Sequence, residues 1–223
     1  ISKYQHGKGR KRYPIHWGAL RITSLGHISN KRVSGKVDYP VSFVYIKSTE
    51  GTTIRNQYYA SDYAQARKHG VKVGAYHFFS TRTSGAMQAK FFLKNTRFRS
   101  GDLPPVLDVE PTAAQIKSMG GVDVMFRNIR QWLKAVQSAT GVKPVLYVGQ
   151  SFVNKYLDSA PDIKKNYNVW IARYGEFKPD VKLLYWQLSP YGRVNGIHGE
   201  VDINVFNGYR SQFDVFVQQN CIR

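Results

Sequence analysis

The chain has 223 residues, of which 42% are hydrophobic and 14% aromatic, a composition typical of one globular domain with a sizeable core. Its single cysteine, Cys221, excludes an intramolecular disulfide and a cysteine-based zinc site, and no apolar run approaches the roughly 18 residues of a membrane helix. The 33 basic and 14 acidic residues give a net charge of +19, which indicates contact with a polyanion. We therefore expect one domain over residues 1–223, without a membrane span.

Strand and helix patterns alternate along most of the chain. In order they are a strand end at residues 1–5, a mostly irregular basic insertion at about 8–40, a strand at 41–47, a helix at 56–69, and strands at 71–79 and 102–110 on either side of a helix at 84–95. A strongly amphipathic helix at 122–137 follows, then a strand at 144–148, a short helix at 151–157, and strands at 168–172, 183–187 and 201–206. This alternation predicts an α/β fold with a parallel sheet, and about eight strands suggest closure into a TIM-like barrel.

Two carboxylates end the strand at residues 102–110. Asp108 and Glu110 are one residue apart and fall on one face, whereas Leu107 and Val109 face the other side. Pro111 blocks further extension, so the acids lie at the carboxyl end of the strand, where α/β folds place their chemistry. An ordinary solvated strand end would also fit an isolated Asp-X-Glu. The buried character of the strand, in a chain poor in acids, favours a catalytic pair.

Side chains suited to binding sugars occur at the carboxyl ends of several predicted strands. Aromatic residues offer flat apolar faces and amides or acids offer hydrogen bonds, and the candidates are Tyr76, Tyr147, Trp170, Trp186, Gln187, Asp202 and Asn204. Each aromatic residue could equally belong to the barrel core. Their concentration at one end of the strands favours a sugar site.

Other catalytic motifs are absent from the sequence. It has no phosphate-binding loop, no Gly-X-Ser-X-Gly nucleophile turn and no His-Glu-X-X-His zinc motif. His77 could polarise a substrate group, although a lone strand histidine is more often structural. The sequence predicts no metal and no cofactor.

Taken together, several segments resemble the family 25 glycoside hydrolases, which are lysozymes. The matching segments occur in family order and are ISKYQ (1–5), FVYIKSTEG (43–51), GAYHFF (74–79), LPPVLDVE (103–110), YWQ (185–187) and VDINVF (201–206). The resemblance implies an irregular barrel with five βα units followed by helix-poor strands. It also implies cleavage of the β-1,4 bond between N-acetylmuramic acid and N-acetylglucosamine in peptidoglycan.

Catalytic roles follow from the resemblance, position by position. Glu110 resembles the general acid of the family, Asp108 its partner carboxylate, and Asp202 a further acid of the same ring. Neighbouring negative charge and partial burial are expected to keep Glu110 protonated. Asp108 could stabilise the transition state, act as a nucleophile, or orient a substrate N-acetyl group that attacks in its place. The family is thought to use the last route, which retains the anomeric configuration.

The sequence departs from the family pattern in two places. The family motif begins Gly-Ile-Asp and its Asp belongs to the carboxylate ring, whereas this chain begins at Ile1, immediately after the expected Asp. The basic segment at 8–40 is also longer than the family pattern. Any export signal or anchor is expected upstream of Ile1, with a secreted or envelope location.

Three interpretations of the function remain at this point. The leading one is a muramidase that acts on peptidoglycan strands and is held on an anionic wall polymer by its charge. A non-catalytic glycan-binding protein on the same barrel is the alternative. A nucleic-acid-binding protein would rest on charge alone, without a recognised binding module, so no nucleic acid partner is expected. Phage lysis, envelope remodelling and attack on competitors fit the first interpretation equally.

Overall fold

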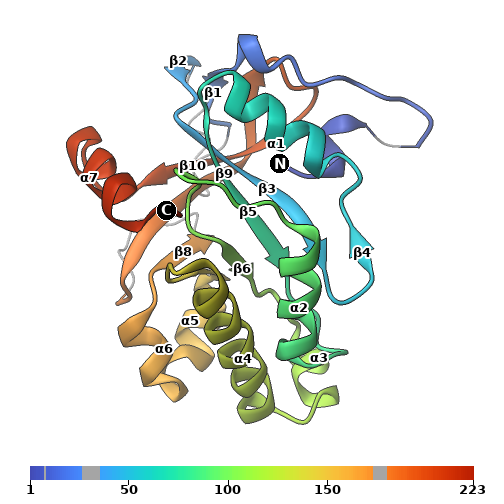
Figure 1. The fold of residues 1–223 in the computed structure, drawn as a ribbon, viewed down its shortest axis with the longest axis vertical. Coiled ribbons are helices and arrows are strands. Elements are labelled where there is room, and N and C mark those ends of the chain that lie inside the picture. The colour runs from blue at the N-terminus through green and yellow to red at the C-terminus, as the bar shows by residue number, and fades with distance from the viewer. Residues whose placement is uncertain (8, 27–35, 173–179) are drawn as a thin grey trace.

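The computed structural model describes residues 1–7, 9–26, 36–172 and 180–223, and in these ranges the chain forms one ten-stranded mixed sheet (Figure 1). Six strands form its centre, each parallel to the next. They are β3 (Phe43–Glu50), β5 (Lys72–Phe78), β6 (Val106–Asp108), β7 (Val145–Gly149), β8 (Val169–Ala172) and β9 (Leu183–Asn195). The predicted α/β class and parallel central sheet are therefore confirmed.

Four further strands pair antiparallel at the two sides of this centre. β4 (Ile54–Arg55) lies on β3, and β10 (Val201–Phe206) lies along the first part of β9. β1 (Arg21–Ser24) pairs with the far end of β9, and β2 (Lys36–Pro40) pairs with β1. The expected barrel is not closed by these pairings, since the strand order runs from β2 to β4 without joining β10 to β3.

The first residues add only a one-residue pairing to the edge of β3. Residues 1–5 were expected to end a strand, but Lys3–His6 form the 3-10 helix η1, which Ser2 caps through its side chain. Only Ile1 pairs with β3: its nitrogen donates to the Tyr45 carbonyl at 2.7 Å, and the Lys47 amide donates to the Ile1 carbonyl at 2.8 Å. This is the hydrogen-bond pattern of a parallel strand, one residue long.

Seven α-helices lie in the described residues. They are α1 (Tyr59–Lys68), α2 (Gly85–Asn95), α3 (Ala113–Ser118), α4 (Val122–Thr140), α5 (Gln150–Tyr156), α6 (Pro161–Asn166) and α7 (Arg210–Asn220), with 3-10 turns η2 (Trp17–Ala19) and η3 (Leu157–Ser159). Among the described residues, helices follow β3, β5, β6, β7 and β10; residues 173–179, directly after β8, lie outside the described ranges, so the expected five βα units stay a prediction. None of the described helices combines the length and the apolar composition needed to cross a bilayer.

Helix ends agree well with their local signals. Ser84 caps α2 by accepting a hydrogen bond from the Met87 amide at 3.3 Å, and Gly141 ends α4 in the left-handed conformation, with φ of 74°. The apolar side of α4 is fully buried against the sheet and against α2. It contributes Trp132, Phe126 and Leu133 to the main hydrophobic core.

Two features of the fold were not predicted. The insertion at 8–40 was expected to be mostly irregular, and its described parts contain the short elements η2, β1 and β2. β1 is short and half exposed, and its stability comes from pairing with β9 about 170 residues away in sequence, for example through Thr23 Oγ1 and the Arg193 carbonyl at 3.3 Å. Helix α7 was not expected, because only Phe213 and Phe216 along it are buried.

A second hydrophobic cluster fills the concave side of the sheet beneath the site described next. It contains Tyr45, Trp170 and Tyr185. Gly74 makes this packing possible, because a Cβ atom there would lie 2.2 Å from the ring of Tyr45. The ring can therefore lie directly across β5.

Candidate active site

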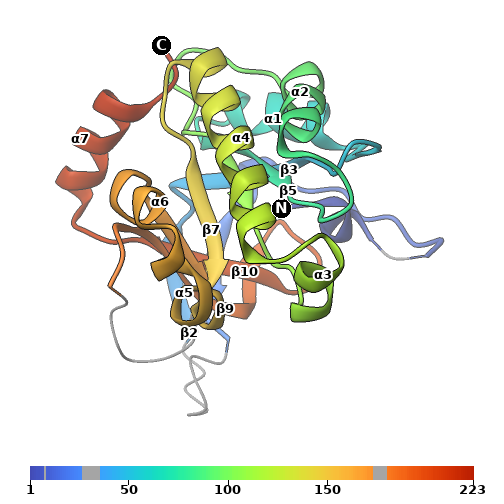
Figure 2. The same ribbon diagram turned by 90° about the horizontal axis from the view of Figure 1, so that it is seen from below.

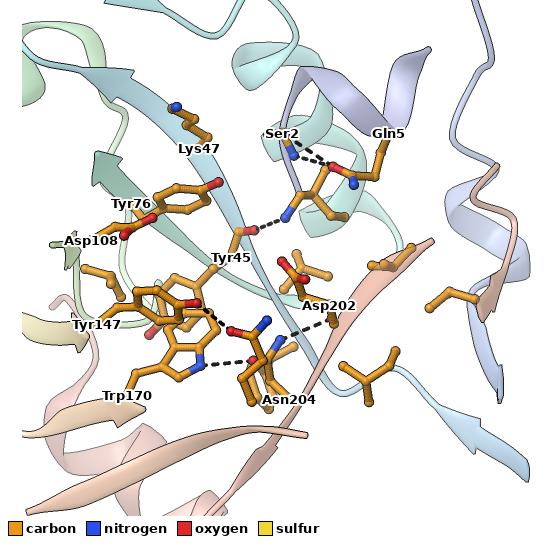
Figure 3. A pocket seen from close by; sticks show the side chains of 18 of the residues that line it. Ser2, Gln5, Tyr45, Lys47, Tyr76, Asp108, Tyr147, Trp170, Asp202 and Asn204 are labelled. Carbon is orange, nitrogen blue, oxygen red and sulfur yellow. Dashed lines mark hydrogen bonds between the residues drawn. The ribbon is translucent and has the colours of Figure 1, made fainter. Parts of the chain in front are cut away.

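A pocket of about 360 Å³ is lined by side chains of the sheet (Figure 3). Side chains from β3, β5, β6, β7, β8, β9 and β10 converge there, together with Ser2 and Gln5 at η1. Its polar lining includes Lys47, Tyr76, Asp108, Glu110, Tyr147, Trp170, Gln187, Asp202 and Asn204. The pocket continues toward the paired strands β1 and β2, where its lining is apolar and consists of Leu20, Ile22, Val41, Val194 and Ile197.

The two acids of the Asp-X-Glu pair both line the pocket but differ in burial. Asp108, the last residue of β6, is 9% exposed, whereas Glu110 beyond the strand end is exposed. Leu107 and Val109 point the other way and are fully buried in the main core, as strand alternation requires. The pair therefore has one carboxyl group inside the wall and one at the solvent side.

Burial is the largest cause of the shifted pKa of Asp108. Loss of hydration, the adjacent charge of Glu110 and a hydrogen bond with Glu110 raise the pKa of Asp108 well above the usual carboxyl value, and the cation of Lys47 offsets part of this. Partial burial was expected to act on Glu110, but the described structure places it on Asp108. The Oδ1 atom of Asp108 is buried without a hydrogen-bond partner among the described residues, so its capacity to accept a hydrogen bond is unused there.

Asp202 and Tyr76 complete the polar wall around this pair. Asp202, on β10, is exposed to the pocket, but the surrounding protein removes part of its hydration and raises its pKa. Burial, followed by the negative charge of Asp108, raises the pKa of Tyr76 well above its usual value. The Tyr76 hydroxyl therefore stays protonated and can donate a hydrogen bond.

Lys47 is a cation in this acidic pocket that sequence reasoning did not single out. Its Nζ atom lies 2.6 Å from Glu50 Oε2 and 4.7 Å from the centre of the Phe78 ring. The Lys47 side chain is 18% exposed, so its charge is only partly screened by water. Alternation along β3 could have identified it, because Tyr45 and Lys47 share one face and Tyr45 also lines the pocket.

The aromatic and amide residues form a hydrogen-bonded floor. Trp170 Nε1 donates to Asn204 Oδ1 at 2.9 Å, and the Tyr147 hydroxyl donates to Gln187 Oε1 at 2.6 Å (Figure 3). The rings of Tyr147 and Trp170 meet edge to face, with centroids 5.2 Å apart. These four side chains come from four different strands and hold one another in position.

Eight of the nine side chains predicted for the site lie in this one pocket, and Trp186 does not. Trp186 precedes Gln187 on β9, so the two point to opposite faces, and Trp186 packs against the main core. His77 also lies outside the pocket: it is fully buried, 2.7 Å from Thr49 Oγ1 and 3.1 Å from Gln88 Oε1. Burial lowers the pKa of His77 to about 4, so it is a neutral core residue.

The wall contributed by η1 was also missed, and a buried pair fastens it. His6 Nε2 lies 2.8 Å from Asp62 Oδ2 of α1, and the His6 ring stacks on Tyr58 at 3.9 Å. Residues 56 sequence positions apart therefore hold Ser2 and Gln5 at the pocket. No group of three or more His, Cys, Asp or Glu side chains placed to hold a metal ion occurs in the described ranges.

Paired carboxylates beside aromatic faces and amides, at the strand ends of an α/β fold, define a carbohydrate-cleaving hydrolase. Comparison with known proteins identifies which one. The family model "Glycosyl hydrolases family 25" matches residues 26–197, and the chain belongs to this family. It is a glycoside hydrolase of the lysozyme, or muramidase, class.

Individual relatives agree with the family. The uncharacterized protein YegX of Escherichia coli (strain K12) is 36% identical over 234 residues, covering 97% of this chain and 82% of YegX. Lysozyme M1 of Streptomyces globisporus is 33% identical over 178 residues, covering 75% of this chain and 60% of that protein. The structure of a bacterial lysozyme from Streptomyces coelicolor matches with a TM-score of 0.73 and 29% identity, covering 95% and 92% of the two chains.

Proposed function

We propose that this muramidase cleaves the β-1,4 bond between N-acetylmuramic acid and N-acetylglucosamine in peptidoglycan, with Glu110 as general acid and Asp108 as its partner. The observation that carries the proposal is the arrangement of a solvent-facing Glu110 beside a buried Asp108, in a pocket floored by aromatic residues. Sugar rings stack on such floors, and the exposed acid can reach the glycosidic oxygen.

The unpartnered oxygen of Asp108 suggests how the second step works. A rotation of the Asp108 side chain would bring this buried oxygen to the pocket surface, where it can accept a hydrogen bond from an acetamido N–H of the bound sugar. That contact turns the acetamido carbonyl oxygen toward the anomeric carbon. That oxygen forms a bond to C1 while Glu110 gives its proton to the leaving oxygen, producing a cyclic oxazolinium ion. Water, deprotonated by Glu110, then attacks C1 from the face that the leaving oxygen left and breaks the bond between C1 and the acetamido oxygen, so the configuration is retained.

Analysis of the products tests the assignment. Purified peptidoglycan digested by the protein should show new reducing ends on muramic acid. New ends on glucosamine, or cleavage of peptide bonds alone, would contradict it. A non-catalytic glycan-binding protein on the same fold would bind the polymer and release no new ends.

Lys47 is expected to set the pH range of activity. Catalysis uses Asp108 as a carboxylate, so activity rises as pH passes upward through the pKa of Asp108. Because the Lys47 charge lowers that pKa, Lys47→Met should raise it further and move the acidic limb of the pH profile to higher pH. Hydrolysis rates measured across pH check this. Glu50→Gln, which keeps the cation and removes its partner, is the control and should show no upward shift; an unmoved limb in Lys47→Met would refute the role.

We also propose that the family's irregular barrel forms when a strand precedes Ile1. Ile1 already pairs with β3 in parallel register, so a preceding segment would continue along the β3 edge toward Phe43. The apolar lining of the pocket near Val41 and Val201 would cover such a strand. Pairing it with β10 as well would close the sheet.

The net charge of +19 fits an envelope location on an anionic wall polymer. Exposed charges attract over a range of about 10 Å at 0.1 M salt, so binding to whole walls should weaken as salt rises. Cleavage of a short neutral oligosaccharide should change little, because that substrate carries no charge for the surface to attract.

A further inference from the structure

Cations gather at the end of the central strands opposite to the acids. Asp108 and Glu110 lie at the carboxyl ends, whereas Lys72 opens β5 and Lys143 lies two residues before β7. We call the following group the amino-end basic face: Arg67 and Lys68 at the end of α1, Lys72, Arg97 and Arg99 before β6, and Lys143. Figure 2 shows β7 pointing away from the end of the molecule where the chain end marked C lies.

A buried carboxylate fastens the elements that carry this face. Asp102, whose side chain is 4% exposed, forms an ion pair with Arg67 and accepts hydrogen bonds from the Tyr63 hydroxyl at 2.6 Å and the Arg99 amide at 2.8 Å. The Asp102 carbonyl also accepts from the Ile222 amide at 2.9 Å. The end of α1, the segment before β6 and the chain near Ile222 are therefore one rigid unit.

Sheet register brings the remaining members alongside. The Leu103 amide donates to the Val73 carbonyl and the Val145 amide to the Pro105 carbonyl, both at 2.8 Å. The segments that open β5, β6 and β7 therefore run side by side. With neighbouring strands about 4.8 Å apart, the backbones at the starts of β5 and β7 are on the order of 10 Å apart.

The face has almost no compensating negative charge of its own. Arg67 is neutralised by Asp102, the carboxylate that ties the face together. Lys68, Lys72, Arg97, Arg99 and Lys143 are all exposed, and none has an ion-pair partner among the described residues. Guanidinium and ammonium groups spread over this distance match a flexible chain of repeated anionic groups, and the arginines bind phosphate oxygens in fork geometry.

We propose that the amino-end basic face docks the enzyme on a phosphodiester-linked polymer of the cell wall. Docking by this face directs the pocket, at the other end of the strands, toward a neighbouring glycan strand. The acids at the pocket would repel the same polymer, which disfavours the reverse orientation. This inference rests on the proposed function, which places the protein on peptidoglycan.

Charge-matched variants of the full chain test the face. The face variant carries Lys68→Gln, Lys72→Gln, Arg97→Gln and Arg99→Gln. The control variant carries Lys90→Gln, Lys117→Gln, Arg127→Gln and Lys155→Gln, four exposed cations on α2, α3, α4 and α5 that have no ion-pair partner in the described ranges. Both lose the same net charge. Circular dichroism and thermal unfolding confirm that each is folded.

Binding is measured by sedimentation with wall sacculi that carry the phosphodiester polymer, and with the same sacculi after chemical removal of it, at low and physiological salt. The face variant should bind the polymer-bearing sacculi about tenfold more weakly than the control variant, with a shallower dependence on salt. Binding to stripped sacculi should be weak and similar for both variants.

Three outcomes would overturn the proposal. These are equal loss of binding in both variants, equally tight binding to stripped sacculi, and face-dependent binding that is tighter to duplex DNA or to phosphatidylglycerol vesicles than to the sacculi. Turnover of a short soluble peptidoglycan oligosaccharide should stay within about twofold in both variants. If the unsubstituted protein fails to cleave that oligosaccharide, the proposed function fails, whereas the binding comparison still decides on the face.

Discussion

Replacing Glu110 by glutamine should lower the rate of peptidoglycan hydrolysis by about 10² to 10⁴, the usual contribution of a general acid. Glutamine keeps the shape of the side chain and removes the proton that the leaving oxygen needs. Because Glu110 is exposed, the free energy of unfolding should change by no more than about 0.5 kcal/mol. Rates of reducing-end release and thermal unfolding curves measure the two effects.

A matched substitution and a second substrate sharpen this test. Glu200→Gln removes an exposed acid that lies 3.7 Å from Arg193 and lines no part of the pocket, so its activity should equal that of the unsubstituted protein. In an aryl glycoside the leaving group is a phenolate, which can depart without full protonation. Hydrolysis of such a substrate should therefore fall much less in Glu110→Gln. Retained peptidoglycan hydrolysis in Glu110→Gln would assign the acid to another residue.

Adding Gly-Ile-Asp in front of Ile1 should increase turnover, by a sizeable part of the 10² to 10⁴ range of acid catalysis. Ile1 packs against the main core, so the residue before it faces the other side of the strand, toward Asp202 and the pocket. A carboxylate there would lie near Asp108 and Asp202. Its negative charge favours retention of a proton on the neighbouring acid Glu110. It also offers the substrate another polar contact.

The control for this experiment is an added Gly-Ile-Asn, which extends the strand equally without the charge. Both proteins are compared with the chain that begins at Ile1, at equal concentration and across pH. Equal activity of all three chains, with unchanged limbs of the pH profile, would show that Asp108, Glu110 and Asp202 suffice. A gain from Gly-Ile-Asn as large as that from Gly-Ile-Asp would assign the effect to the strand alone.

The sequence predicted those parts of the fold whose stability is local. The helix near Val122 carries an apolar stripe and ends at Gly141, and Ser84 begins the next strongest helix, so both could be located without tertiary information. The ribbon of β1 and β2 could not, because its strands are short and largely exposed and depend on the far end of β9. Barrel closure was overestimated, because Ile1 alone of the first residues pairs with β3 and the strand order does not join β10 to β3.

Alternation along strands identified most of the pocket, and it also explains the errors. Asp108 and Glu110 share a face, as expected, but alternation excludes Trp186 once Gln187 faces the pocket. Spacing does not predict burial. Sequence reasoning therefore expected partial burial of Glu110, whereas the buried acid is Asp108. Gln5 reaches the pocket only because η1 folds back onto α1, a contact between distant segments that no local pattern indicates.

The paired floor of the pocket has a consequence for how tightly glycan is held. Trp170 is already joined to Asn204, and Tyr147 to Gln187, so their rotamers are selected when the protein folds and not when substrate arrives. Immobilising side chains of this kind during binding costs roughly 0.5 to 1.5 kcal/mol each, and here that cost falls outside the association step. A sugar therefore meets a surface that is ordered before contact, and the affinity gained from stacking is not spent on arranging the floor.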